Sequence, residues 1–136
     1  MGMGRGDLTP LKFISSLLHW CLVKNRPEKL LFVCSQNRWR SLTAQEIYRD
    51  SALYQVKSAG TDKGARIRLT VEHIGWADRI FVMEKKHLDR VRHDFGTVLD
   101  DKKLICLHIP DSYQYMDPKL VELLKDNLSP FVEVPD

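Results

Sequence analysis

Short, continuously apolar segments alternate with helical segments through most of this chain, and the alternation narrows the folds that it can adopt. The apolar segments have the length and composition of strands that are buried on both faces of a sheet. Strands that alternate with helices are joined by right-handed crossovers into a parallel sheet covered on both faces. The pattern therefore predicts an α/β fold with a four-stranded parallel sheet in three αβα layers. The strand segments lie at residues 29–33, 54–58, 79–83 and 104–109, and the helical segments at residues 41–50, 71–76, 85–93 and from Pro118 onward.

Length and composition fit one globular domain. A chain of 136 residues is long enough to bury a single core. Its 43% hydrophobic and 29% charged residues exclude a disordered, collagen-like or coiled-coil protein. Cys21, Cys34 and Cys106 are an odd number of cysteines without CxxC spacing, so we expect neither a disulfide framework nor a structural zinc site. A cytoplasmic location, where thiols stay reduced, fits this cysteine content.

The N-terminal part of the chain differs from the rest. Residues 13–23 form an uncharged run of 11 residues, which is too short to cross a bilayer. Leu11, Ile14 and Leu18 recur at helical spacing and indicate a short amphipathic helix. We therefore expect residues 1–27 to be an extension and residues 28–136 to form one α/β domain, without membrane association.

Charge is distributed unevenly along the chain. Residues 1–110 hold 19 Lys and Arg against 12 Asp and Glu, whereas residues 111–136 hold 2 against 6. The net charge of +3 is too small to indicate nucleic-acid binding. A basic body followed by an acidic tail favours an anionic substrate.

The segment between the first predicted strand and the first predicted helix is where we expect chemistry, because ligands of parallel sheets bind at the carboxyl ends of strands. It reads Cys-Ser-Gln-Asn-Arg-Trp-Arg-Ser from Cys34 to Ser41. A loop that enters a helix N-terminus directs several N–H groups and the helix dipole at one point, which suits a phosphate-like dianion. The same field favours the thiolate form of Cys34, and Arg40 is placed to grip two oxygens. The simpler alternative is that Cys34 is an inert core thiol.

The loop resembles that of the low-molecular-weight protein tyrosine phosphatases, which is Cys-x5-Arg followed by Ser or Thr. The similarity extends at intervals over residues 29–126. Asn37 matches the family's loop asparagine, which holds an unusual backbone conformation, and residues 58–61 match its Ser-Ala-Gly stretch. Residues 77–84 resemble its third strand, and residues 110–113 resemble the loop that supplies the general acid. With this resemblance we expect the flavodoxin-like strand order 2-1-3-4.

The resemblance implies a hydrolase that removes phosphate from phosphotyrosine or a similar aryl phosphate through a phosphocysteine intermediate. In that reaction Cys34 is the nucleophile, Arg40 is the phosphate clamp and Ser41 stabilises the sulfur. Asp111 is the implied proton donor, because Asp117 fits better as the cap of the last helix. The other implied roles are phosphate binding by Ser35, Gln36, Asn37, Arg38 and Trp39, bracing of Asn37 by Ser58, and pocket walls formed by Tyr113 and Tyr115.

The implied chemistry needs no metal and no cofactor. The histidines lack ligand spacing, so we expect solvated or core positions for them. The expected substrates are a phosphotyrosine protein or a small aryl phosphate, and phosphate, sulfate and vanadate are expected to bind the loop. The four histidines of residues 28–136 are His73, His87, His93 and His108.

The chain departs from the family pattern at four places. Gln36 stands where the family usually has glycine, and Ser112 stands where it has proline. Trp39 replaces the second loop cysteine of many members, so a protective disulfide with Cys34 is not available. The segment between Gly60 and Asp78 is much shorter than usual and lacks a helix that builds part of the pocket wall.

Two other functions stay open at this point. Gln36, Ser112 and the triplet formed by residues 38–40 suggest a non-catalytic module that binds phosphate or a nucleotide. An arsenate reductase on the same fold would relay electrons through further cysteines, for which Cys21 and Cys106 are poorly placed.

Overall fold

A four-stranded parallel sheet with the order β2-β1-β3-β4 forms the centre of the protein. The structure is a computed structural model, and it describes residues 26–135 of the chain. The predicted sheet and its strand order are confirmed. The expected N-terminal helix falls on residues that lie outside the described part. The strands are β1 (Glu28–Cys34), β2 (Tyr54–Gly60), β3 (Arg79–Val82) and β4 (Leu104–Cys106).

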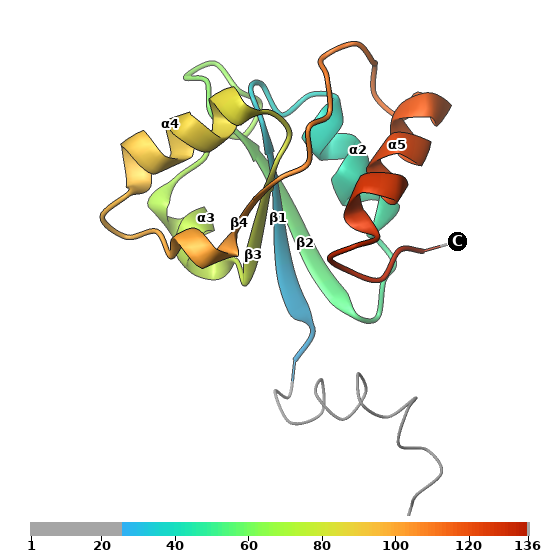
Figure 1. Cartoon of the computed structure of the whole chain (residues 1–136), viewed down its shortest axis with the longest axis horizontal. Coiled ribbons are helices and arrows are strands. Elements are labelled where there is room, and N and C mark those ends of the chain that lie inside the picture. The colour runs from blue at the N-terminus through green and yellow to red at the C-terminus, as the bar shows by residue number, and fades with distance from the viewer. Residues whose placement is uncertain (1–25, 136) are drawn as a thin grey trace, which may run out of the picture.

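Helices cover both faces of the sheet, which gives the three predicted layers. Figure 1 shows α2 and α5 on one side of the strands and α3 and α4 on the other. No helix within residues 26–135 is long and apolar enough to span a membrane. The helices are α2 (Arg40–Ile47), α3 (Val71–Trp76), α4 (Lys85–Phe95) and α5 (Pro118–Leu128), with a short 3-10 helix η1 (Asp101–Lys103) before β4.

The core is divided by β1, whose successive side chains point to opposite faces of the sheet. Leu30 and Phe32 belong to the cluster that α2 and α5 cover, where Phe32 stacks on Tyr48 with ring centroids 5.9 Å apart. Leu31 and Val33 belong to the cluster on the α3 and α4 face. All four of these β1 side chains are fully buried. Burial on both faces explains why this strand is continuously apolar.

Some predicted boundaries are wrong. The fourth strand ends at Cys106 and not at residue 109, because His108 takes a positive φ of 57° that breaks regular strand geometry. Pairing nevertheless continues beyond it, since Ile109 N donates to Met83 O at 2.7 Å. The first helix ends at Ile47 and not at residue 50. The last helix begins as predicted, with the Asp117 carboxylate accepting from Lys119 N at 2.9 Å.

Gly60, the last residue of β2, lies beside Cys34 in the sheet. A Cβ at this position would lie 2.5 Å from Ser35 O and 3.0 Å from Asn37 N. These are backbone atoms of the loop after β1, so they have little freedom to move aside. A glycine is therefore required for β2 to approach this loop.

We expect Gly60→Ala to destabilise the protein by about 1–3 kcal/mol, the usual cost of forcing extra atoms into a packed site. Urea unfolding measures this loss. Gly64→Ala is the matched control, because no atom lies within 4 Å of a Cβ built there. Equal unfolding free energies for the two variants would contradict the steric argument.

Candidate active site

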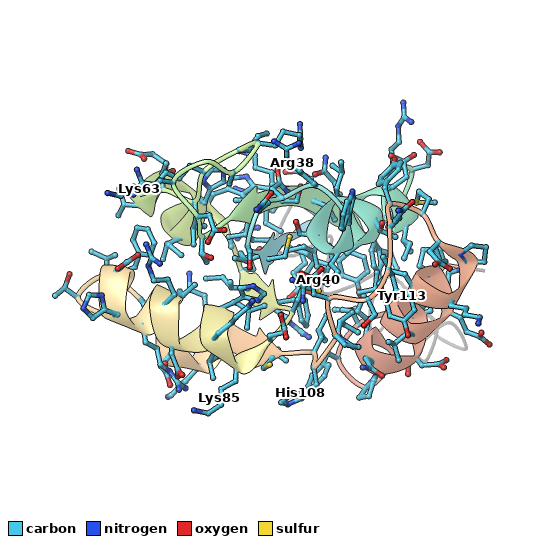
Figure 2. The ribbon with its side chains drawn as sticks, turned by 90° about the horizontal axis from the view of Figure 1, so that it is seen from above. Arg38, Arg40, Lys63, Lys85, His108 and Tyr113 are labelled. Atoms are coloured by element: carbon cyan, nitrogen blue, oxygen red, sulfur yellow. The ribbon has the colours of Figure 1, made fainter. Side chains whose placement is uncertain are left out.

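A pocket of about 300 Å³ opens at the carboxyl edge of the sheet. Figure 2 looks down on this edge, with Arg40 near the centre and Lys63 at the periphery. The lining residues come from the segments that follow each of the four strands, so the fold brings together four separate parts of the chain. They are Cys34, Ser35, Gln36, Arg38, Trp39 and Arg40 after β1, Asp62 after β2, Lys86 in α4 after β3, and Asp111 after β4.

The backbone carbonyls of residues 34–37 are all held by the segment that follows β2. A trans peptide unit directs its C=O and its N–H to opposite sides. Carbonyls that are held on one side therefore turn the N–H groups of residues 35–38 to the other side. The bonds are Thr61 N to Cys34 O at 2.9 Å, Asp62 N to Ser35 O at 2.9 Å, Arg66 N to Gln36 O at 2.9 Å, and Arg66 Nε to Asn37 O at 3.1 Å.

The loop offers unpaired donors to an anion. Within residues 26–135, the N–H groups of Ser35, Gln36, Arg38 and Trp39 donate to no protein acceptor. Trp39 is also the N-cap of α2 and provides no side-chain cap, so the first N–H groups of that helix stay available. Such a concave set of N–H groups at a helix N-terminus binds phosphate-like anions.

Cys34 lies at the base of the loop as a free thiol that is 3% exposed. Its Sγ accepts from Asn37 N at 3.3 Å and lies 3.0 Å from Ser41 Oγ. Because Ser41 Oγ already accepts from Asn37 Nδ2 at 2.8 Å, its own hydroxyl hydrogen is free to point at the sulfur. Two hydrogen-bond donors, Asn37 N–H and the Ser41 hydroxyl, therefore face Sγ.

Asn37 and Gln36 adopt the loop conformation without glycine. Asn37 has a φ of 58°, a region that asparagine tolerates better than most residues. Gln36 is not among the residues with positive φ, so a glycine is not needed there. Asn37 is fully buried behind the loop and does not line the pocket, so its expected direct contact with phosphate is not formed by its side chain.

Arg40 is oriented by contacts with residues from two other segments. Its Nη1 donates to Glu84 Oε1 at 2.7 Å and to Ile109 O at 2.9 Å, and the side chain is 3% exposed. Burial raises the pKa of Glu84, but the hydrogen bond and charge of Arg40 outweigh it and hold that pKa below its ordinary value. Glu84 therefore stays ionised and keeps Arg40 pointed into the pocket.

Asp111 also lines the pocket. Its side chain is 55% exposed, and its Oδ1 lies 3.7 Å from Arg40 Nε. Asp117, the other acid considered, does not line the pocket and caps α5 instead. The structure thus brings Asp111 to the same pocket as Cys34 and Arg40.

Three predicted roles need correction. Tyr113 and Tyr115 do not line this pocket: Tyr113 packs against the core cluster under α5, and Tyr115 is exposed. Among the described residues no hydrogen bond joins Ser58 to Asn37, because the Ser58 hydroxyl donates to Gln45 Oε1. Asn37 Oδ1 is consequently buried without a hydrogen-bond partner within residues 26–135.

Four residues of the site could not be predicted from the sequence patterns. Glu84 and His87 at the start of α4 contact Arg40 and Ser35, and Asp62 and Lys86 line the pocket. All four follow the carboxyl ends of β2 or β3, where parallel sheets bind ligands. This position in the chain is the only sequence feature that indicates a place in the site.

The part of the chain that the structure describes holds no group of three His, Cys, Asp or Glu side chains suited to a metal. Cys106 is half-buried and lies 3.6 Å from His108 Nδ1. It does not line the pocket with Cys34.

The sheet order defines a flavodoxin-like α/β protein, with a pocket at the carboxyl edge of the sheet. No protein-family model and no curated protein sequence matches the chain. Solved structures match its fold. SP-PTP, a low molecular weight protein tyrosine phosphatase from Streptococcus pyogenes, is 16% identical with a TM-score of 0.64, over 78% of this chain and 94% of that one.

Two further structures give the same result. The tyrosine phosphatase Wzb from Escherichia coli K30, solved with phosphate, is 20% identical with a TM-score of 0.62, over 76% of this chain and 95% of that one. The arginine phosphatase YwlE from Geobacillus stearothermophilus is 22% identical with a TM-score of 0.58, over 76% and 92%. The chain therefore has the fold of the low-molecular-weight protein tyrosine phosphatases.

The buried histidine of the site makes stability depend on pH. Burial, aided by the charge of Arg40, lowers the pKa of His87 from its ordinary 6.5 to about 4. The unfolded chain binds a proton below pH 6.5 and the folded chain only near pH 4, so the free energy of unfolding falls as pH falls through this window. Between pH 6.5 and 5 we expect a loss of about 1.6 kcal/mol from this group, measured by urea unfolding.

His87→Asn removes the titrating ring and is expected to flatten this pH dependence. Burial also lowers the pKa of His73, but that residue is present in both proteins and cancels in the comparison. Identical slopes for the parent protein and the variant would show that His87 is not the group responsible.

Proposed function

We propose that the protein is a cysteine-dependent phosphatase that hydrolyses phosphotyrosine or a similar aryl phosphate through a phosphocysteine intermediate. One observation carries the proposal: the carbonyls of residues 34–37 are all held behind the loop, so N–H groups converge on the pocket that also holds Cys34 and Arg40. The fold shared with solved phosphatases supports it.

In the first step, the Cys34 thiolate attacks phosphorus in line with the leaving oxygen. A bond forms between Sγ and phosphorus as the bond from phosphorus to the aryl oxygen breaks. Asp111, in its protonated form, gives its proton to that oxygen and releases a neutral phenol. The loop N–H groups and Arg40 stabilise the charge on the phosphoryl oxygens.

In the second step, the Asp111 carboxylate takes a proton from a water molecule as the water oxygen attacks the phosphocysteine. The bond from sulfur to phosphorus breaks and inorganic phosphate leaves. The returning thiolate is stabilised by donors already in place, the Asn37 N–H at 3.3 Å and the Ser41 hydroxyl at 3.0 Å. All protons and electron pairs are accounted for by Cys34, Asp111 and water.

An aryl leaving group suits this pocket for two reasons. A phenolate leaves more easily than an alkoxide, and Trp39, which lines the pocket and is 45% exposed, offers an aromatic face. Arg38 and Lys86 add positive charge to the lining and favour an anionic substrate. The free thiol of Cys34 requires a reducing compartment, so we place the activity in the cytosol.

The test is hydrolysis of p-nitrophenyl phosphate and of a phosphotyrosine peptide between pH 5 and 7. We expect turnover by the parent protein, inhibition by vanadate and no turnover by Cys34→Ser. Asp111→Asn is expected to lower kcat by roughly 10²–10⁴-fold, because it removes general acid and base catalysis.

Matched variants act as controls in this assay. Cys106→Ser and Asp117→Asn are expected to retain turnover, since neither side chain lines the pocket. A folded parent protein that binds phosphate but hydrolyses neither substrate would overturn the proposal in favour of a binding module. Reduction of arsenate without hydrolysis would overturn it in favour of a reductase.

A further inference from the structure

His87 is buried at the start of α4 and joins the helix to the phosphate loop. It is 1% exposed and occupies the third position of the helix, where its Nδ1 lies 3.0 Å from Glu84 N. Its Nε2 lies 2.8 Å from Ser35 Oγ. The ring thus bridges a backbone group of one segment and the residue that follows Cys34 in another.

The direction of both hydrogen bonds follows from the Glu84 backbone. An amide N–H only donates, so Nδ1 accepts and carries no proton. The neutral ring therefore holds its proton on Nε2 and donates it to Ser35 Oγ. Burial lowers the pKa of His87 to about 4, which keeps the ring neutral between pH 5 and 7.

Ser35 then has one hydrogen left to donate. Its oxygen accepts from His87, and within residues 26–135 its hydroxyl makes no other hydrogen bond. Ser35 lines the pocket beside Cys34, where the phosphoryl group of the substrate would lie. An oxygen of an oxyanion bound in this pocket can accept that hydrogen.

We propose that the Ser35 hydroxyl is a further hydrogen-bond donor to the bound phosphoryl group and that His87 is the positioning residue that orients it. This inference rests on the proposed function for its substrate, although it concerns any tetrahedral oxyanion in the pocket. Glu84 connects it with the rest of the site, because its backbone N–H orients His87 while its carboxylate orients Arg40.

The chain contains a second histidine in the same local setting, which serves as a control. His73 occupies the third position of α3, and its Nδ1 accepts from Thr70 N at 3.0 Å. In the described part of the chain its Nε2 has no hydrogen-bond partner, and it does not line the pocket. A substitution that acts only through helix capping should therefore change oxyanion affinity equally at His73 and at His87.

The experiment compares phosphate affinity by calorimetry and vanadate inhibition for matched variants. Ser35→Ala removes the donor, and we expect roughly 10- to 100-fold weaker oxyanion binding, the effect of one hydrogen bond to a charged group. His87→Asn keeps an acceptor for the Glu84 N–H but is too short to reach Ser35, and it is expected to weaken binding similarly. His87→Gln carries an acceptor and a donor at the spacing of the ring nitrogens, so it should bind more tightly than His87→Asn.

Two comparisons of oxyanion affinity distinguish a positioning role of His87 from a loss of protein stability. The double variant of Ser35→Ala and His87→Asn should bind no more weakly than Ser35→Ala alone, because both act through the same hydroxyl. His73→Asn should bind oxyanions like the parent protein.

Unchanged oxyanion affinity in Ser35→Ala, or equal losses in His87→Asn and His73→Asn, would overturn the inference. Because affinity is measured without turnover, a parent protein that binds phosphate but does not hydrolyse esters refutes only the proposed function. A parent protein that binds no oxyanion refutes both.

Discussion

The hydrogen bonds that hold the carbonyls of residues 34–37 are the constraint on which the site depends. They fix the loop before any ligand arrives, so its N–H groups need no reorganisation to meet an anion. The bonds form only because β2 approaches the loop closely, which Gly60 permits. The electrostatic character of the pocket is therefore set by packing between two backbones, and side chains add to it.

The segment after β2 holds the loop after β1 in place, which the sequence patterns did not predict. The segment turns back to β2, where Leu69 N donates to Gly60 O at 2.8 Å. Arg66 donates to the loop twice, from its backbone N to Gln36 O and from its Nε to Asn37 O. The segment contributes only Asp62 to the pocket lining. Among the described residues, Trp39 is the one aromatic residue of the pocket lining.

The sequence predicted the features that depend on residues close together in the chain. Buried strands, the cap at Asp117 and the loop between Cys34 and Ser41 follow from short-range composition, and the strand order followed from the family that the loop resembles. The roles of Glu84 and His87 did not follow, because each depends on a contact with a residue more than 40 positions away. The tyrosines were misassigned for the same reason, since the path of an irregular segment is set by tertiary packing.

The ion pair between Arg40 and Glu84 limits the positive charge that Arg40 presents to the pocket. A buried guanidinium is tolerable only with a partner, and Glu84 at 2.7 Å neutralises much of its charge. The attraction for a dianion therefore comes from the N–H groups, the α2 dipole and the lining residues Arg38 and Lys86.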